Sequence, residues 1–518
     1  MKSVFLSLQT PRAASPLFAA LMVLASLPLT APARATIASD DTQAVQAAVN
    51  AAIKANKPLI IPAGATYFLK GSIRISGPLT VHCQPRTKFL LDFDPNFDPH
   101  DAADAAAFSI TSSNVTIDGC WFDGDNLGTN VLQPGSVGRM AIWLEGSSTK
   151  PLRNVIIEND TFTNLTQYGG TQPASLPASH AVYGTELDTF VYENNTVDNI
   201  SGSALHIEAC SNATVTGNNI HQTGWASIVF YGDCHFSSIT NNTITGNGPD
   251  TRYWGGSIDV FSQDSTGLPP NSNIVIDGNY ISGVHMYGAA IRVGSAQYIT
   301  VTNNQLIDIS SGSVDLVSGI GMTPRVMPAT ASSSCTTAPF ANCANGRNMF
   351  YNIISGNTIE SLGTNAIGIY IIGETIPLNQ IVGNLGVSHD FTITNNQILS
   401  VDDDNYFQNC IIIHGGYSGI TDVTVEGNTC KVRTTDPPAV LAGAIRLAVY
   451  PASDNNPTPA VLQNIKINSN NVVWFGSPAP TKSQSAYGIY IGPGSQDVQI
   501  LNNALSGWYD GIYVYPQP

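Results

Sequence analysis

The chain has 518 residues, of which 43% are hydrophobic and only 11% are charged, and its formal net charge is −16. This acidic balance argues against a nucleic-acid partner, because phosphates require a basic surface. The scarcity of charge together with 46 glycines is typical of a β-rich, turn-rich extracellular protein, not of a helical cytosolic one.

The first 35 residues have the organisation of an export signal. Lys2 and Arg12 precede the apolar run LFAALMVLASLPLT, and the small-x-small sequence ARA provides a cleavage site. The apolar run is shorter than the roughly 20 residues that a bilayer span requires. We therefore predict a signal peptide over 1–35, no stable membrane insertion, and a secreted or periplasmic protein.

An amphipathic helix is predicted next, over 41–56. Asp41 or Thr42 can serve as its N-cap. Its apolar face contains Val45, Ala48, Val49 and Ile53.

A repeated pattern, apolar-x-apolar-x-x-Asn-x-apolar, then runs to the end of the chain with a shortest spacing of about 23 residues. It aligns Asn195, Asn218, Asn242, Asn279, Asn304, Asn357, Asn396, Asn428, Asn470 and Asn503 in one column, with Cys120 and Asp160 in two earlier copies. Short strands and tight turns with this period indicate a parallel β-helix. Each asparagine is expected to bond its counterparts in the coils above and below.

The asparagine column and the opening DDTQAVQAAVNAAIKANKPLIIPAGATYFL resemble the pectate lyase superfamily, in particular its branch related to polygalacturonases and phage tailspikes. The resemblance implies an all-β fold, a right-handed parallel β-helix with three sheets, and a short N-terminal capping helix. It covers residues 36–518 as a single domain, with the cap at about 36–60. Members of this superfamily cut, epimerise or bind polysaccharides. For this chain we expect a polysaccharide or oligosaccharide substrate and either a monomer or a homotrimer.

One strand of each coil carries outward residues suited to chemistry. In AIWLE, ALHIE, SIVFY, SIDVF and AIRVG, the second and fourth residues are core aliphatics, so the third and fifth face outward. These outward positions give Trp143 and Glu145, Tyr183 and Thr185, His206 and Glu208, Val229 and Tyr231, Asp259 and Phe261, Arg292 and Gly294, then Asp315 and Val317. Later copies give Tyr370, Ile412, His414, Arg446 and Tyr490, without carboxylates. The resemblance implies that this sheet forms the floor of a substrate groove.

Glu208 and Asp259 are the predicted catalytic pair. They lie two coils apart, about 9.6 Å, and inverting glycosidases separate their carboxyls by roughly 6.5 to 9.5 Å. Arg292 beside Asp259 favours ionisation and a role as base, whereas Glu208 is expected to keep its proton and act as acid. His206, Tyr231 and Arg292 are assigned supporting catalytic roles. The pair Glu145 and Glu208 has the same spacing, and a purely structural salt-bridge ladder is the alternative.

The substrate-binding prediction comprises Trp143, Glu145, Tyr183, Arg252, Trp254 and Asp315. The aromatic members can stack on sugar rings. Inserts at 163–179, 246–255, 262–272 and 319–349 are expected to form groove walls.

Cleavage of glycosidic bonds by hydrolysis is the leading functional prediction. A polysaccharide lyase acting on a uronic-acid glycan, with or without calcium, and a non-catalytic glycan-binding protein remain open. No cofactor or metal-ligand set is assigned, although calcium would suit the carboxylates. The motif DPHD at 98–101 is associated with mannuronan epimerases but lies here before most of the repeat, and the polygalacturonase signature is absent.

The eight cysteines permit disulfides in an exported chain. Cys335 and Cys343 are expected to form a local bridge. Cys210 and Cys234, on successive repeats, are expected either to bridge or to stack.

Overall fold

The computed structural model describes residues 40–91, 106–124, 140–165, 179–246, 254–262, 270–284, 287–309, 317–323, 349–362, 366–373, 387–402, 409–416, 418–434, 442–449, 460–475 and 486–516. The predicted signal peptide, the DPHD motif and the Cys335–Cys343 bridge lie outside these residues. No helix among them is long and apolar enough to cross a membrane.

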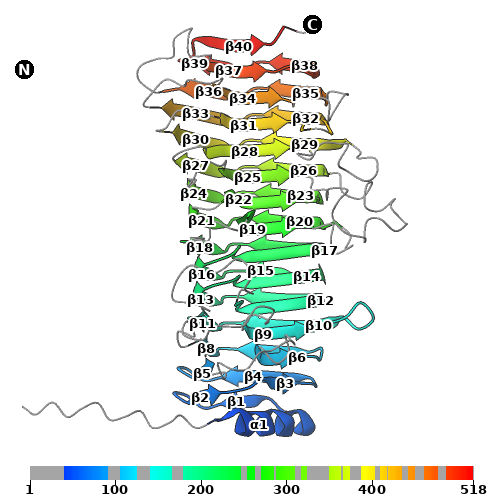
Figure 1. The fold of residues 1–518 in the computed structure, drawn as a ribbon, viewed down its shortest axis with the longest axis vertical. Coiled ribbons are helices and arrows are strands. Elements are labelled where there is room, and N and C mark those ends of the chain that lie inside the picture. Colours follow the sequence, from blue (N-terminus) through cyan, green and yellow to red (C-terminus); the bar gives the residue numbers. More distant parts are fainter. Residues whose placement is uncertain are drawn as a thin grey trace, which may run out of the picture. The chain divides into compact units, whose positions relative to one another are not determined.

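Within the unit Asp40–Pro518, successive coils pair in parallel, and each full coil contributes a strand to each of three faces (Figure 1). Face 1 contains β3 (Ile73–Ile75), β6 (Ala106–Ile110), β9 (Met140–Glu145), β12 (Val182–Glu193), β14 (Leu205–Ser211), β17 (Ile228–Thr240), β19 (Trp254–Phe261), β22 (Tyr287–Gly294), β25 (Val317–Thr323), β28 (Ala366–Ile372), β31 (Asn409–His414), β34 (Ala442–Ala448), β37 (Ala486–Ile491) and β40 (Asp510–Val514).

Face 2 continues each coil around a corner, and the long strands β12 and β17 extend across that corner from face 1. Its other strands are β1 (Leu59–Ile61), β4 (Leu79–Cys83), β7 (Val115–Asp118), β10 (Leu152–Glu158), β15 (Thr214–Thr216), β20 (Ser272–Asp277), β23 (Gln297–Thr302), β26 (Phe350–Ser355), β29 (Ser388–Thr394), β32 (Ile420–Glu426), β35 (Leu462–Asn468) and β38 (Ser495–Leu501).

Face 3 is a separate sheet of 14 strands. Its members are β2 (Thr66–Leu69), β5 (Lys88–Leu91), β8 (Trp121–Asp123), β11 (Thr161–Thr163), β13 (Thr196–Ile200), β16 (Asn219–Thr223), β18 (Thr243–Thr245), β21 (Tyr280–Val284), β24 (Gln305–Ile309), β27 (Thr358–Leu362), β30 (Gln397–Asp402), β33 (Thr429–Thr434), β36 (Asn471–Trp474) and β39 (Ala504–Ser506). The three faces and the parallel pairing confirm the predicted β-helix.

The helix α1 (Thr42–Ala55) packs against the first coil, where β1, β2 and β3 begin the stack. Val45 and Val49 are buried as predicted, but Ala52 is buried where Ala48 was expected. The side chain of Asp41 does not cap the helix: its Oδ2 accepts a hydrogen bond from the backbone N–H of Phe68 on β2. This bond joins the start of the helix to the coil that it covers.

The asparagine column forms the predicted ladder at the turn between face 2 and face 3. Asn242 shows the pattern: its Oδ1 accepts from the Asn218 backbone N–H at 3.0 Å and from Asn218 Nδ2 at 2.9 Å. Its own Nδ2 donates to Val215 O at 3.1 Å and to Asn279 Oδ1 at 2.9 Å. Asp160 continues the ladder by accepting from the Cys120 backbone N–H. Buried turn groups are thereby satisfied from one coil to the next.

Three disulfides join described residues: Cys210–Cys234, Cys83–Cys120 and Cys410–Cys430. Cys210 and Cys234, which were expected either to bridge or to stack, form a disulfide. The other two were not predicted, because their partners are brought together by the coil geometry and have no shared sequence pattern.

Candidate functional site

Strand pairing on face 1 arranges the outward side chains in two columns, as predicted. The first column runs through Trp143, Tyr183, His206, Val229, Asp259, Arg292, Gly321, Tyr370, Ile412, Arg446 and Tyr490. The second runs through Glu145, Thr185, Glu208, Tyr231, Phe261, Gly294 and Thr323.

One predicted register is wrong. The residue beside Arg292 on the next coil is Gly321 in β25, not Asp315. Sequence alternation is ambiguous in SVDLVSGIGMT, whereas the structure uses Ile320 and Met322 to fill the core. Asp315 and Arg252 lie outside the described residues, as does the side chain of Trp254.

Glu208 lies at the centre of a cluster on β12, β14 and β17. Tyr183 donates a hydrogen bond from its hydroxyl to Glu208 Oε1, and His206 Nε2 lies 3.6 Å from the same oxygen. The rings of Tyr183 and His206 are stacked, with centroids 4.6 Å apart and planes 16° apart. In-register pairing of adjacent coils places these three side chains together, and the Glu208 side chain remains 30% exposed.

The charge state of Glu208 differs from the sequence-based prediction. Burial alone would raise the pKa of its carboxyl group, but His206 and the Tyr183 hydroxyl stabilise the carboxylate and lower the pKa below its ordinary value. The distance of 3.6 Å from His206 Nε2 to Glu208 Oε1 is longer than that of a hydrogen bond. Glu208 is therefore an ionised group suited to accept a proton, not the protonated acid expected from the sequence.

His180 is a member of this cluster that sequence analysis missed. It is buried, and its ring meets those of Tyr183, His206 and Trp225 edge-on at 5.3 to 5.4 Å. Its Nδ1 accepts a hydrogen bond from the Ser203 backbone N–H, which places the ring proton on Nε2. Burial lowers the pKa of His180 well below its ordinary value, so the imidazole is neutral. His180 precedes its strand outside the two columns, so the alternation gave no signal for it.

Asp259 and Arg292 form a bidentate ion pair on adjacent coils. Arg292 Nε donates to Asp259 Oδ1 at 2.8 Å and Nη2 donates to Oδ2 at 2.5 Å. The guanidinium also lies over the Phe261 ring, 4.4 Å from its centroid. Only 7% of the Asp259 side chain is exposed. Both carboxylate oxygens of Asp259 are thus occupied, and this geometry favours a positioning ion pair over a water-activating base.

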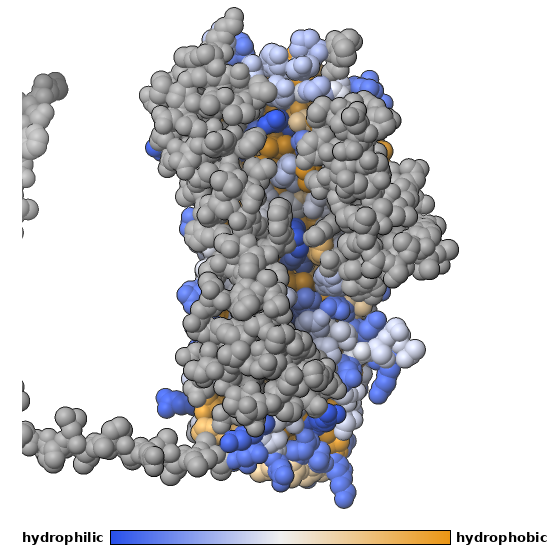
Figure 2. Space-filling model, in the orientation of Figure 1, coloured by the Kyte–Doolittle hydropathy of each residue, from blue (hydrophilic) through white to orange (hydrophobic). Residues whose placement is uncertain are grey.

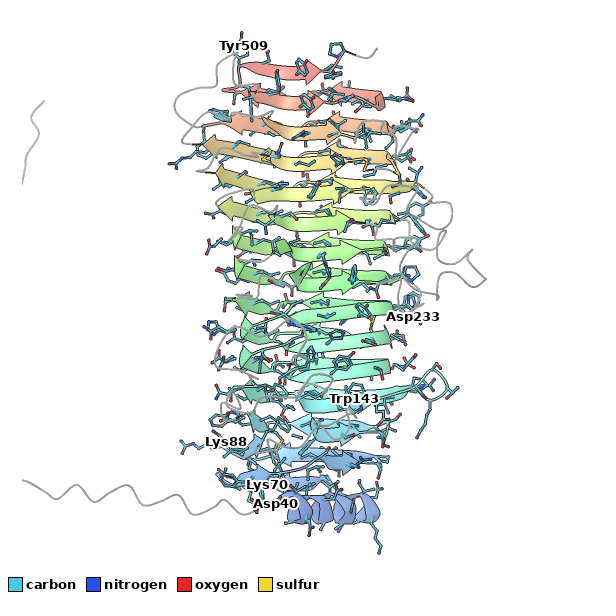
Figure 3. The ribbon with its side chains drawn as sticks, viewed as in Figure 1. Asp40, Lys70, Lys88, Trp143, Asp233 and Tyr509 are labelled. Carbon is cyan, nitrogen blue, oxygen red and sulfur yellow. A yellow bond between two sulfur atoms is a disulfide. The ribbon has the colours of Figure 1, made fainter. Side chains whose placement is uncertain are left out.

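Aromatic rings extend the cluster in both directions along the stack. Trp143 stacks on Tyr183 with centroids 5.1 Å apart, and Figure 3 places it on the side of the stack formed by β9 and its neighbours. The centroid of the Tyr231 ring lies 5.9 Å from that of the His206 ring and 5.9 Å from that of the Phe261 ring. Figure 2 shows hydrophilic and apolar residues side by side midway along the stack. Flat rings beside carboxylates are the surface that sugar recognition requires.

The later coils of face 1 carry a different set of groups. His414 and Arg446 lie on adjacent strands, and Arg446 lies 5.8 Å from the centroid of Tyr490. Burial, reinforced by the charge of Arg446, lowers the pKa of His414 to about 4. Throughout the described residues, no group of three or more His, Cys, Asp and Glu side chains is arranged to hold a metal ion.

Comparison with known proteins identifies the architecture. The family model for the right handed beta helix region matches residues 100–268 and 177–325. No curated protein matches the sequence. Among solved structures, a mutant tailspike protein of E. coli bacteriophage HK620 in complex with a pentasaccharide is 14% identical, with a TM-score of 0.51 over 89% of this chain and 68% of that chain.

The A-module of mannuronan C-5 epimerase AlgE4 from Azotobacter vinelandii is 13% identical, with a TM-score of 0.39 over 94% of this chain and 97% of that chain. The surface adhesin PfbA of Streptococcus pneumoniae is 13% identical, with a TM-score of 0.45 over 90% of this chain and 88% of that chain. The chain therefore has the fold of a right-handed parallel β-helix.

Proposed function

We propose that this protein is an enzyme that hydrolyses glycosidic bonds of a polysaccharide lying along face 1. The observation that carries the proposal is the ionised Glu208, accessible to solvent and held by Tyr183 and His206. Trp143 and Tyr231 flank it with flat ring surfaces. The tailspike protein with the same fold was solved with a pentasaccharide, which supports a carbohydrate ligand.

Glu208 is assigned the role of general base. Its carboxylate removes a proton from water as the water oxygen attacks the anomeric carbon, and a second carboxylic acid protonates the leaving glycosidic oxygen as the C–O bond breaks. Glu145 is the preferred acid, because it lies two coils from Glu208 in the same outward column. Two coils correspond to about 9.6 Å, within reach of the spacing of an inverting pair.

Asp259 and Arg292 are then assigned a positioning role. Their ion pair fixes the floor next to Tyr231 and Phe261, and it leaves Asp259 poorly placed to accept a proton from water. The pair Glu208 and Asp259, predicted from the sequence, is the competing assignment within the same hydrolytic mechanism. Substituting Glu145 and Asp259 in turn distinguishes the two assignments.

A lyase is the second candidate, and the charges of the cluster disfavour it. The ionised Glu208 would repel the carboxylate of a uronic-acid substrate, and the charge of Arg292 is balanced by Asp259. A calcium ion would be needed to reverse this repulsion. The cluster therefore supports a neutral sugar at the cleavage point.

We also expect the protein to act outside the cytoplasm. Three disulfides among the described residues support an oxidising compartment, in agreement with the predicted export signal. Whether it acts as a monomer or a homotrimer stays a prediction.

The test is a screen of purified protein against neutral and uronic-acid polysaccharides, recording both new reducing ends and the absorbance of unsaturated products. Reducing ends without that absorbance indicate hydrolysis, and both signals indicate a lyase. Glu208→Gln should lower the rate by about 10²- to 10⁴-fold with substrate binding retained, because it removes proton transfer but keeps the shape. Full activity of this variant, or no product from any glycan, contradicts the proposal.

A further inference from the structure

A recessed surface lies on face 2, away from the Glu208 cluster. It is a cavity of about 410 Å³ on four successive strands, β26, β29, β32 and β35, the first three of which Figure 1 shows side by side. Its lining comprises Tyr351, Ile353, Asp390, Phe391, Thr392, Asp422, Thr424 and Asn464. The volume falls within the range of small-ligand sites in proteins.

Four of these lining residues belong to one column at the corner between faces 1 and 2, where the backbone is left-handed. The column reads Asn114, Asn154, Thr189, Asn212, Phe236, Asn273, Tyr298, Tyr351, Asp390, Asp422, Asn464 and Asp497, all with φ between 49° and 60°. Asparagine and aspartate tolerate this conformation, whereas a bulky aromatic residue is strained in it. Tyrosine at two successive positions therefore opposes the local backbone preference.

The two tyrosines also oppose the usual preference for burying aromatic rings. Tyr298 and Tyr351 stack on each other with centroids 5.1 Å apart and planes 19° apart, and they are 46% and 49% exposed. Strained backbone positions persist where function requires them. Here they hold a flat aromatic surface at the edge of the cavity.

Polar side chains line the cavity on the coils that follow Tyr351. Asp422 Oδ1 accepts a hydrogen bond from Asn464 Nδ2 at 3.0 Å, and His389 Nδ1 lies 2.7 Å from Asp390 Oδ2. A carboxylate has about four acceptor positions, so each aspartate retains capacity for the hydroxyl groups of a ligand. Thr392 and Thr424 add hydroxyls from the adjoining outward column.

We propose that this cavity, with its tyrosine pair, is a binding site for a neutral sugar unit, separate from the cleavage site. The exposed Tyr351 ring stacks on the apolar face of the sugar, and the carboxylates of Asp390 and Asp422 accept hydrogen bonds from its hydroxyls. The same carboxylates repel a uronate. The site does not depend on the catalytic assignment, and it would hold a polysaccharide against face 2 whatever reaction occurs on face 1.

The test measures binding of cellohexaose, maltohexaose and hexagalacturonate by isothermal titration calorimetry, using the full chain. We expect one of the neutral hexasaccharides to bind the wild type and Tyr351→Asn to weaken that binding at least about tenfold. Because asparagine suits the left-handed position, the melting temperature of this variant should equal or exceed that of the wild type. Loss of binding is then separated from loss of folding.

Phe236→Asn is the matched control, because Phe236 is an exposed aromatic residue of the same corner column but does not line the cavity. It should leave binding unchanged. Equal loss in Phe236→Asn, unaltered binding in Tyr351→Asn, equally tight binding of hexagalacturonate, or no binding of either neutral probe would overturn the proposal.

Discussion

The early and late coils of face 1 share one backbone but carry opposite chemistry. Between β9 and β19 the outward columns hold the carboxylates Glu145, Glu208 and Asp259, whereas between β31 and β37 they hold His414 and Arg446. Both regions have the same parallel, in-register pairing of successive coils. The contrast shows that the repeat supplies positions, and that the side chains placed on those positions decide what each region can do.

The largest effect that we expect is on the rate of hydrolysis, and it should differ between the carboxylates of the early coils. Glu145→Gln should reduce hydrolysis by about 10²- to 10⁴-fold, because it removes the proposed acid, whereas Asp259→Asn should act less strongly and lower thermal stability by weakening its ion pair. Arg446→Ala, on the late coils, is the matched comparison and should change turnover of a short substrate by no more than about threefold. Rates on one soluble oligosaccharide test all three variants.

A reversed order for the first two variants would restore Asp259 as the catalytic partner of Glu208. A loss in Arg446→Ala as large as that in Glu145→Gln would abolish the division of face 1 into two regions.

The late coils should instead influence stability in acid. His414 has a pKa of about 4 in the folded protein, against 6.5 ordinarily, so the unfolded chain binds a proton that the native chain does not as the pH falls from 6.5 to 4. This residue alone should remove up to about 3 kcal/mol from the free energy of unfolding over that interval. The variant His414→Gln should not lose this share of the free energy of unfolding in acid. Urea unfolding at pH 7 and pH 4 provides the measurement. Parallel losses in both proteins would contradict the prediction.

The asparagine ladder should contribute equally to the stability of the early coils and of the late coils. Asn242→Ala, beside the early coils, and Asn428→Ala, beside the late coils, each remove the same four hydrogen bonds to neighbouring coils. Each substitution should lower the free energy of unfolding by about 1 to 3 kcal/mol, because buried partners lose their bonds. Chemical denaturation provides the measurement, and an unchanged midpoint in either variant would show that the ladder is not uniform.

The smallest effect concerns the pH dependence of the early coils. Tyr183→Phe removes the hydroxyl that stabilises the Glu208 carboxylate, so the pKa of Glu208 should rise. A base with a higher pKa is protonated at higher pH, and the acidic limb of the kcat/KM profile should therefore move upward. A limb that stays in place, or moves downward, would mean that Glu208 is not the base whose titration limits the reaction.

The repeat, and with it most of face 1, could be predicted from the amino-acid sequence. A fixed turn asparagine and a strict apolar alternation assign side chains to core or surface, because strand side chains alternate with a period of two. The Glu208, His206 and Tyr183 positions followed directly from this alternation. The prediction from alternation was wrong at β25, because two overlapping apolar alternations are possible in its sequence. The packing of Ile320 and Met322 into the core selects one of them.

The charge states and the contacts of the Glu208 cluster depend on how the coils are stacked in the folded protein. Local sequence gives no sign that Tyr183 and His206 converge on one oxygen of Glu208 and lower its pKa, or that the buried His180 joins them from outside the columns. A pKa depends on burial and on neighbouring groups, and Tyr183 reaches Glu208 from the adjacent coil, 25 residues away in the chain. The Cys83–Cys120 disulfide and the aromatic residues at left-handed corner positions likewise depend on how coils of unequal length stack, and no single repeat encodes that stacking.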